Sequence, residues 1–328
     1  MSELRFRFPE LKSGVGMLIE DFIAEKMALH YRYLATTKLL IRFDEFLAER
    51  GLAACALPQQ LVQEWLQMRD YEGPKTQRKR FNLTYQFAEF MVQRGYEAYL
   101  PDCRLQPVVR DYFAPYVFTR DEVRRLIEAA DHIRRTARAP SRHIIMPEIY
   151  RLLYGCGLRI GEAVRLTRMD SDLEQGILII RDTKFGKDRL VPMAPPLAKR
   201  LKRMSERLDQ IGKSRYLFPG RDGGHITRDT VYLTFRDLLC EIGISHGGPG
   251  KGPRVHDLRH TFACHRLVDW YREGADLSAK LPLLATYMGH RTLFGTQRYL
   301  HLTMEVSAEF TNQSDNRLGY IIPTEAQP

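Results

Sequence analysis

Six residues in the C-terminal half of the chain have side chains that together could bind a phosphodiester and attack it. They follow one another as Arg159, Lys184, His256, Arg259, His290 and Tyr299. Two guanidinium groups can grip the non-bridging oxygens of a phosphate, and a lysine and two histidines can transfer protons. A tyrosine hydroxyl can form a covalent intermediate without a metal. The set therefore predicts covalent chemistry on a phosphodiester.

The motif GCGLRIGE predicts how the first arginine is held. Arg159 follows Gly155 and Gly157, so we expect it at a turn that enters a helix, from which its guanidinium can project towards an anion. Glu162 lies one helical turn further and could fix the orientation of the arginine. In isolation, this pattern would be read as an ordinary surface ion pair.

The motif HDLRH places a histidine and an arginine three residues apart. A helix beginning near Val255 would present His256 and Arg259 on one face, where the histidine could accept or relay the tyrosine proton and the arginine could neutralise the phosphate charge of the transition state. An alternative is a metal site formed by His256, His260 and Cys264. We reject it because no matching ligand pair occurs elsewhere, and we expect His260 to be a structural histidine.

Two β-rich runs, residues 177–180 and 189–193, predict a hairpin with a long tip. Lys184 lies at this tip and could protonate the departing 5′ oxygen. Lys187 is a second candidate for this acid, and Arg189 follows it closely. Without the other motifs, a solvated charged turn would be the better interpretation of this segment.

The last motif joins His290 to Tyr299, with Gly295 between them. This spacing predicts a helix, a turn and a second helix, so that the tyrosine hydroxyl can move towards the phosphate that His290 helps to bind. Taken alone, Tyr299 would be assigned to core packing.

Composition favours a nucleic-acid partner. The chain has 328 residues, a formal net charge of +10 and a pI near 9.4, so its surface should attract polyanions, although an ordinary basic protein would share this charge. Its five cysteines form no CxxC pair, which argues against disulfides or a zinc ribbon. No apolar run approaches about 18 residues, so we expect a cytoplasmic, nucleoid-associated protein and no membrane partner.

Helical periods and proline breaks predict two domains. The expected divisions are an N-terminal lead (1–14), a helical DNA-binding domain (15–98), a linker (99–117), a catalytic domain (118–312) that is mostly α with one small β-sheet, and a tail (313–328). After the linker, Thr119 and Glu122 form a possible capping box.

A basic cluster begins the last helix of the first domain. Its members are Lys75, Arg78, Lys79 and Arg80. We expect these side chains to contact DNA phosphates, with a solvated helix start as the alternative. We expect the same phosphate contacts from Lys187 and Arg189.

The ordered series Arg, Lys, His-x-x-Arg, His and Tyr resembles the tyrosine recombinase (phage-type integrase) family, and its spread over about 140 residues is more specific than any one motif. The resemblance implies that Arg159, Arg259, His256 and His290 activate the scissile phosphate, Lys184 is the general acid and Tyr299 is the nucleophile. Glu162 and Gly289 match supporting positions of the family. Arg298 departs from the pattern, because an apolar residue is common before the tyrosine.

The resemblance also implies the architecture and the partners. It predicts a C-shaped clamp on DNA, formed by a SAM-like core-binding domain and an integrase-type catalytic domain. The expected partner is double-stranded DNA with paired recombination sites, held by a homotetramer on two duplexes, with or without a second recombinase. The family needs neither a metal nor ATP, so no cofactor is expected. Because the lead before the first expected helix is short, we expect no arm-binding domain, which points to transposon recombinases or to the resolution of chromosomes and plasmids.

Three other functions remain open from the sequence. A type IB topoisomerase would use nearly the same residues to rejoin the same strand. A non-catalytic DNA-binding protein would lose groups from the site, and a metal-dependent nuclease would need clustered acids. The target sequence and the outcome of recombination, whether integration, excision, inversion or resolution, do not follow from the sequence.

Overall fold

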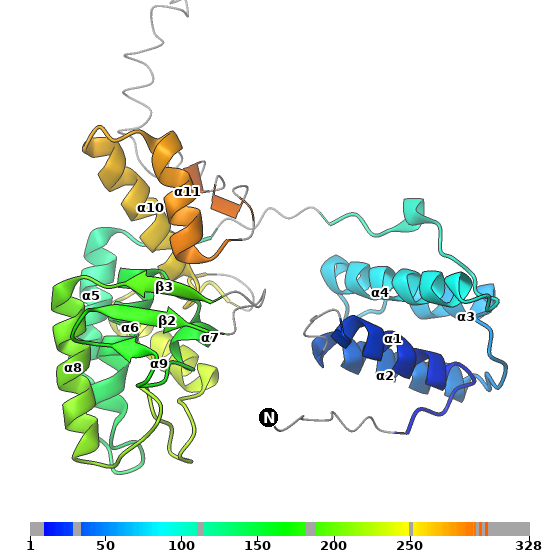
Figure 1. The fold of residues 1–328 in the computed structure, drawn as a ribbon, viewed down its shortest axis with the longest axis horizontal. Coiled ribbons are helices and arrows are strands. Elements are labelled where there is room, and N and C mark those ends of the chain that lie inside the picture. The colour runs from blue at the N-terminus through cyan, green and yellow to red at the C-terminus, as the bar shows by residue number, and fades with distance from the viewer. Residues whose placement is uncertain are drawn as a thin grey trace, which may run out of the picture. The chain divides into compact units, whose positions relative to one another are not determined.

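The structure is a computed structural model that describes residues 10–28, 34–109, 115–181, 188–248, 252–290, 292, 295–296 and 299–300. The chain divides into two compact units, residues 1–112 and residues 113–328 (Figure 1). The architecture is mostly helical with a small antiparallel sheet, as the sequence predicts.

The described part of the first unit is built from helices. They are α1 (Gly16–Ala28), α2 (Leu34–Glu49), α3 (Gln59–Leu66) and α4 (Pro74–Gln93), followed by a 3-10 turn, η1 (Cys103–Leu105). Their apolar faces meet in an aromatic core, in which Phe87 packs edge-on against Phe22 and Phe43. Trp65 is buried beside them and donates its indole N–H to the hydroxyl of Thr84 at 3.2 Å.

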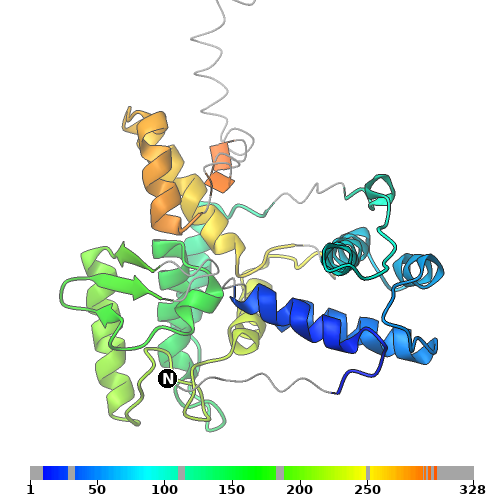
Figure 2. The ribbon, with the colours of Figure 1, turned by 45° about the vertical axis from the view of Figure 1, so that its right-hand side comes forward.

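The second unit contains the other described helices and the strands. The elements are α5 (Arg120–Asp131), α6 (Arg142–Cys156), α7 (Ile160–Ala163), β1 (Ser171–Asp172), β2 (Ile177–Ile180), β3 (Arg189–Pro192), α8 (Pro195–Asp209), α9 (Arg228–Glu241), α10 (Asp257–Arg272) and α11 (Leu277–Met288). The buried helix α6 packs against α5, α8 and α10. Helices α10 and α11 lie side by side in Figures 1 and 2.

The sheet has the strand order β1-β2-β3, and both pairings are antiparallel. Strands β2 and β3 form the predicted hairpin, with Leu178 opposite Val191 on the buried side. Strand β1 was not predicted, because two residues carry no alternating pattern.

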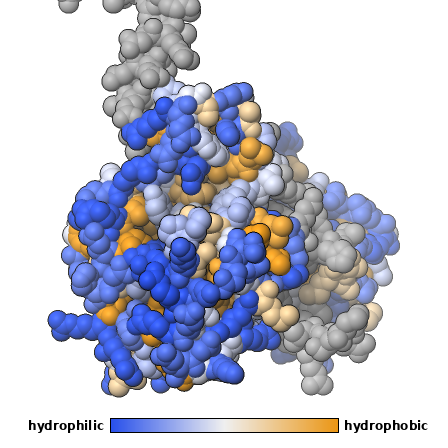
Figure 3. Space-filling view, turned by 60° about the vertical axis from the view of Figure 1, so that its left-hand side comes forward, coloured by the Kyte–Doolittle hydropathy of each residue, from blue (hydrophilic) through white to orange (hydrophobic). Residues whose placement is uncertain are grey.

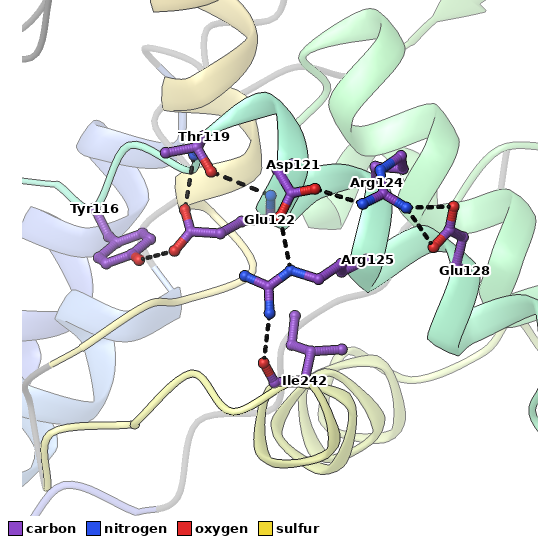
Figure 4. Close-up of polar contacts among 8 residues, drawn as sticks. All are labelled: Tyr116, Thr119, Asp121, Glu122, Arg124, Arg125, Glu128 and Ile242. Carbon is purple, nitrogen blue, oxygen red and sulfur yellow. Dashed lines mark hydrogen bonds and ion pairs between the residues drawn. The ribbon is translucent and has the colours of Figure 1, made fainter.

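A capping box begins α5, as the sequence predicts (Figure 4). The N–H of Glu122 donates to the hydroxyl of Thr119 at 3.1 Å, and the N–H of Thr119 donates to the Glu122 carboxylate at 2.7 Å. The hydroxyl of Tyr116 donates to the same carboxylate, and Arg125 donates to the carbonyl of Ile242 just beyond α9. These contacts fix the start of the second unit on its core.

The face of the molecule in Figure 3 is mostly hydrophilic, with hydrophobic residues in small separate groups. In the part of the chain that the structure describes, no helix combines the length and the apolar character needed to cross a membrane.

Candidate active site

The turn between α6 and α7 holds Arg159. Gly157 ends α6 with φ of +57°, in the left-handed region, and a Cβ atom there would lie 2.4 Å from the Phe262 ring. Arg159 precedes α7, and its Nη1 donates to the Glu162 carboxylate at 2.7 Å. Its Nη2 donates to the carbonyl of Gly289 at 3.0 Å. The guanidinium is thus oriented by one carboxylate and one backbone group, and it stays partly exposed.

Glu162 joins two arginines from different elements. Arg189, at the start of β3, donates to both of its carboxylate oxygens, at 3.2 and 2.8 Å, and also to the carbonyl of Tyr287 at 2.9 Å. Burial alone would raise the pKa of Glu162, but Arg189 and Arg159 outweigh it and hold the pKa at about 2. The carboxylate is therefore charged at neutral pH.

This network corrects the prediction that Arg189 contacts DNA. Its side chain is only 9% exposed and is committed to Glu162 and to a carbonyl at the end of α11. Arg189 instead connects β3, α7 and α11, the elements around Arg159.

Arg259 lies on α10 and is only 2% exposed. Its Nη1 donates to the carbonyl of Gly157 at 2.6 Å, and its Nη2 donates to the carbonyl of Met288 at 2.7 Å. Burial, helped by the nearby charge of Arg159, lowers the pKa of Arg259 to about 10, so it remains a cation at neutral pH. Carbonyl groups from two distant segments therefore fix the position of a buried positive charge.

His290 follows α11 and contacts that guanidinium. Gly289 ends the helix with φ of +68°, and a Cβ there would lie 2.9 Å from Nη1 of Arg189. The Nε2 of His290 is 2.9 Å from Nη2 of Arg259, and its Nδ1 is 2.7 Å from the hydroxyl of Thr296. Since the arginine can only donate, Nε2 accepts and Nδ1 carries the proton. Burial and the charge of Arg259 lower the pKa of His290 to about 3, which keeps it neutral.

His256 immediately precedes α10, close to both site arginines. Burial lowers its pKa to about 4, and the charges of Arg259 and Arg254 act in the same direction. Its ring meets the ring of His260 edge to face, with centroids 4.8 Å apart. Within the described ranges, no group of three or more His, Cys, Asp or Glu side chains is placed to hold a metal ion.

Tyr299 is buried in the same cluster, with 3% of its surface exposed. Its hydroxyl is 3.0 Å from Nδ1 of His260, and its ring lies near the ring of His290 with centroids 5.9 Å apart. Burial raises the pKa of the phenol, and the charge of Arg259 opposes this effect. The structure therefore brings together five of the expected residues, which are Arg159, His256, Arg259, His290 and Tyr299.

The contact between His260 and Tyr299 was missed at the sequence level. The predicted role of His260 was structural, although its position one residue after Arg259 could have indicated that it lies in the site. Lys184 and Lys187 lie outside the described residues.

The four basic residues at the start of α4 differ in how far their side chains are exposed. Lys75 and Lys79 are exposed and Arg78 is partly exposed, but Arg80 is 2% exposed and pairs with the buried Glu72. Arg80 also donates to the carbonyl of Gln67 at 2.8 Å. It is an internal ion-pair partner, so its predicted phosphate contact is wrong.

A groove of about 630 Å³ opens beside His256. It lies between α9 and the segment before α10, and its polar lining includes Arg228, Tyr232, Arg236, His246 and Arg254. The Arg228 guanidinium occupies the space next to Gly161, where a Cβ would approach it to 2.4 Å. Its arginines outnumber the one carboxylate of the lining, Asp229, so the groove is basic, and it reaches His256.

Residues 116–306 match the model of the phage integrase family, a span that includes every residue of this cluster. The chain belongs to the phage integrase family. It is 30% identical, over 91% of its length and 96% of the relative, to a Sinorhizobium fredii protein named as an integrase/recombinase, y4rB. It is 28% identical to the tyrosine recombinase XerD of Bradyrhizobium diazoefficiens, over 88% of this chain and 92% of that protein. The protein is therefore a tyrosine-type site-specific DNA recombinase.

Solved structures share the fold of this integrase. The Tn1549 transposon integrase in complex with transposon right-end DNA matches it with a TM-score of 0.63 and 17% identity, covering 92% of this chain and 99% of that one. XerH recombinase bound to its difH substrate matches with a TM-score of 0.58 and 18% identity, covering 81% and 76%.

Proposed function

We propose that Tyr299 is the nucleophile of this recombinase. Its hydroxyl attacks a phosphodiester in one DNA strand, which gives a 3′-phosphotyrosyl bond and a free 5′ hydroxyl. The hydroxyl of a partner strand then attacks this bond and releases the tyrosine. The observation that carries the proposal is the convergence of Tyr299, His290 and the buried Arg259 in one network of contacts.

The two arginines bind the phosphate and stabilise its transition state. Each keeps N–H groups beyond those used on Glu162, the carbonyls and His290, because a guanidinium has five donors. Since their positions are fixed before substrate binds, they stabilise developing charge with little reorganisation. Glu162 is a supporting residue that orients Arg159.

The histidines that face these arginines complete the phosphate site. His290 and His256 are held neutral by burial and by the neighbouring cations. A bound phosphate would bring negative charge close to both rings and favour their protonated forms. Each can therefore donate a hydrogen bond to the phosphate during the reaction. The general acid remains assigned to Lys184, with Lys187 as the other candidate.

The partner is double-stranded DNA, and the basic groove beside His256 provides a path for the strand that is cut. Arg228 and Arg236 can meet phosphates, and Tyr232 offers an aromatic surface next to them. The exposed Lys75 and Lys79 of α4, with Arg78, provide further phosphate contacts from the first unit. Solved relatives of this fold were determined with DNA bound, which supports this partner.

The full reaction needs two duplexes with paired sites, held by a tetramer of this chain or of this chain with a second recombinase. Similarity to a protein named as an integrase/recombinase and to a transposon integrase favours the integration or excision of a mobile element. Resolution of chromosomes or plasmids is the second possibility, favoured by the similarity to XerD.

A nicked duplex that loses its 5′ fragment after cleavage tests the proposal. The wild-type protein should accumulate a covalent adduct on this substrate, and Tyr299→Phe should bind the DNA but form none. An adduct that persists in Tyr299→Phe would refute the assignment. Exchange between two differently marked duplexes separates recombination from a topoisomerase, which would rejoin only the original strand.

A further inference from the structure

The hydroxyl of Tyr299 needs a group that accepts its proton as it attacks phosphorus. A phenol is a poor nucleophile while it stays protonated, and burial raises the pKa of Tyr299 further. The charge of Arg259 opposes this shift, but an arginine has no lone pair with which to accept a proton. The proton acceptor must therefore be another neighbour of the phenol.

His260 is positioned for this role. It follows Arg259 on α10, and its Nδ1 lies 3.0 Å from the Tyr299 hydroxyl. The two ring centroids are 5.5 Å apart. The tautomer of His260 that carries its proton on Nε2 leaves Nδ1 free to accept the hydrogen of the phenol at this distance.

The other two histidines of the cluster are engaged differently. His290 uses Nε2 on Arg259 and Nδ1 on Thr296, so neither ring nitrogen is directed to the phenol. The sequence predicted that His256 takes or relays the tyrosine proton, but His256 contacts the ring of His260 edge to face, and the nitrogen 3.0 Å from the phenol belongs to His260. In the part of the chain that the structure describes, the charged or titratable groups near the phenol and His260 include Arg159, Arg259, His256, His290 and the buried Cys264.

We propose that His260 is a catalytic residue that takes the proton of Tyr299 during cleavage. The Tyr299 oxygen forms its bond to phosphorus, the bond from phosphorus to O5′ breaks, and the phenol proton moves to Nδ1 of His260. The departing O5′ takes a proton from the general acid, for which the family resemblance implies Lys184. In rejoining, the steps reverse and His260 returns the proton to the phenol. The inference rests on the proposed role of Tyr299 as nucleophile.

The test compares His260→Gln with the matched variant His256→Gln on the nicked duplex. Glutamine can hydrogen-bond to the phenol but is not a base at neutral pH. We expect His260→Gln to keep the DNA affinity of the wild type and to form the adduct at least ~10²-fold more slowly. Its rate should rise with pH, because hydroxide then removes the phenol proton.

A fluorinated tyrosine at position 299, which ionises at lower pH, separates a base from a merely structural contact. With this residue, the defect of His260→Gln should shrink strongly, whereas a defect of His256→Gln should persist. Adduct formation by His260→Gln at the wild-type rate, or an equal defect with tyrosine and fluorotyrosine, would overturn the inference.

If His260→Gln does not fold, the proposal can still be tested in protein that keeps His260 and carries only fluorotyrosine at position 299. In the wild type, fluorotyrosine should leave the acidic limb of the pH–rate profile in place, because that limb follows protonation of the base and not ionisation of the phenol. A limb that moves to lower pH together with the phenol would count against His260 as the base. Tyr299→Phe separates a failure of the proposed function from a failure of the role of His260. If it still forms the adduct, the proposed function fails; if it forms none while His260→Gln reacts normally, only the role of His260 fails.

Discussion

At the scale of single residues, the main feature of the site is that backbone carbonyls hold the guanidinium groups of two arginines in place. Arg259 is almost fully buried, and the carbonyls of Gly157 and Met288 hold its two terminal nitrogens. Arg159 is held by Glu162 and the carbonyl of Gly289. Because these partners come from separate elements, the phosphate site exists only when the second unit is folded.

Arg259→Lys tests whether this geometry matters beyond the positive charge. A lysine has one terminal nitrogen and cannot reach both carbonyls and His290 at once. We expect adduct formation to slow by ~10²- to 10³-fold, with a much smaller loss of DNA affinity. Rapid-quench measurement of the adduct and a binding titration check this, and equal losses in both would contradict a transition-state role.

Arg189→Leu tests the internal role that the structure gives to Arg189. Removing it leaves Glu162 buried with only Arg159 as a partner, and breaking a buried ion pair typically costs about 3 to 5 kcal/mol. Denaturant unfolding should show such a loss. The control is Arg124→Leu, which removes an exposed arginine that pairs with Asp121 and Glu128, and it should leave the free energy of unfolding nearly unchanged. Similar stabilities for the two variants would refute the assignment.

At the scale of elements, glycines in the left-handed region bring the site residues together. Gly157 ends α6 two residues before Arg159, and Gly289 ends α11 one residue before His290. At both positions a side chain would collide with a neighbour, Phe262 or Arg189. The sequence motifs GCG and MGH therefore reflect close packing as well as turns.

Gly157→Ala should destabilise the second unit more than a glycine change with space around it. Gly274 provides the control, because it has φ of +71° and no atom lies within 4 Å of the position that a Cβ would take there. We expect Gly274→Ala to cost about 1 to 2 kcal/mol from backbone strain alone. Gly157→Ala should cost about 1 to 3 kcal/mol more, from the collision with Phe262. Equal losses in thermal or denaturant unfolding would contradict this packing.

The sequence predicted the elements whose signals are local. Helical periodicity gave the helices of the first unit, the capping box marked the start of α5, and alternating β-rich runs gave β2 and β3. What it missed depends on contacts between distant segments. Nothing local distinguishes the internal arginines Arg80 and Arg189 from their exposed neighbours, and the contact between His260 and Tyr299 spans 39 residues.

At the scale of the whole molecule, partly buried neutral histidines make folding sensitive to acid. His256, His265 and His290 have pKa values of about 4, 4 and 3, all below the ordinary 6.5, because burial disfavours their charged forms. The unfolded chain therefore takes up protons first as the pH falls. Glu162 adds to this effect, since its pKa of about 2 lies below its ordinary 4.5.

We expect the free energy of unfolding to fall as the pH drops from about 6.5 towards 3, because the histidines are protonated more readily in the unfolded chain. Below about pH 4.5, Glu162 adds to this fall, because its carboxylate is also protonated more readily in the unfolded chain. Urea unfolding at a series of pH values measures it. His290→Gln should make the slope between pH 6.5 and 4 shallower, because glutamine does not titrate. A stability that rises on acidification would contradict the buried neutral state of these rings.

Mapping the covalent DNA–protein bond tests the central claim most directly. After trapping on the nicked duplex and digestion with protease and nuclease, mass spectrometry should find a 3′-phosphonucleotide on the peptide that contains Tyr299, and only on its phenol. A bond to another residue, such as Tyr287 or Tyr271, or a cleaved strand with no protein attached, would contradict the account.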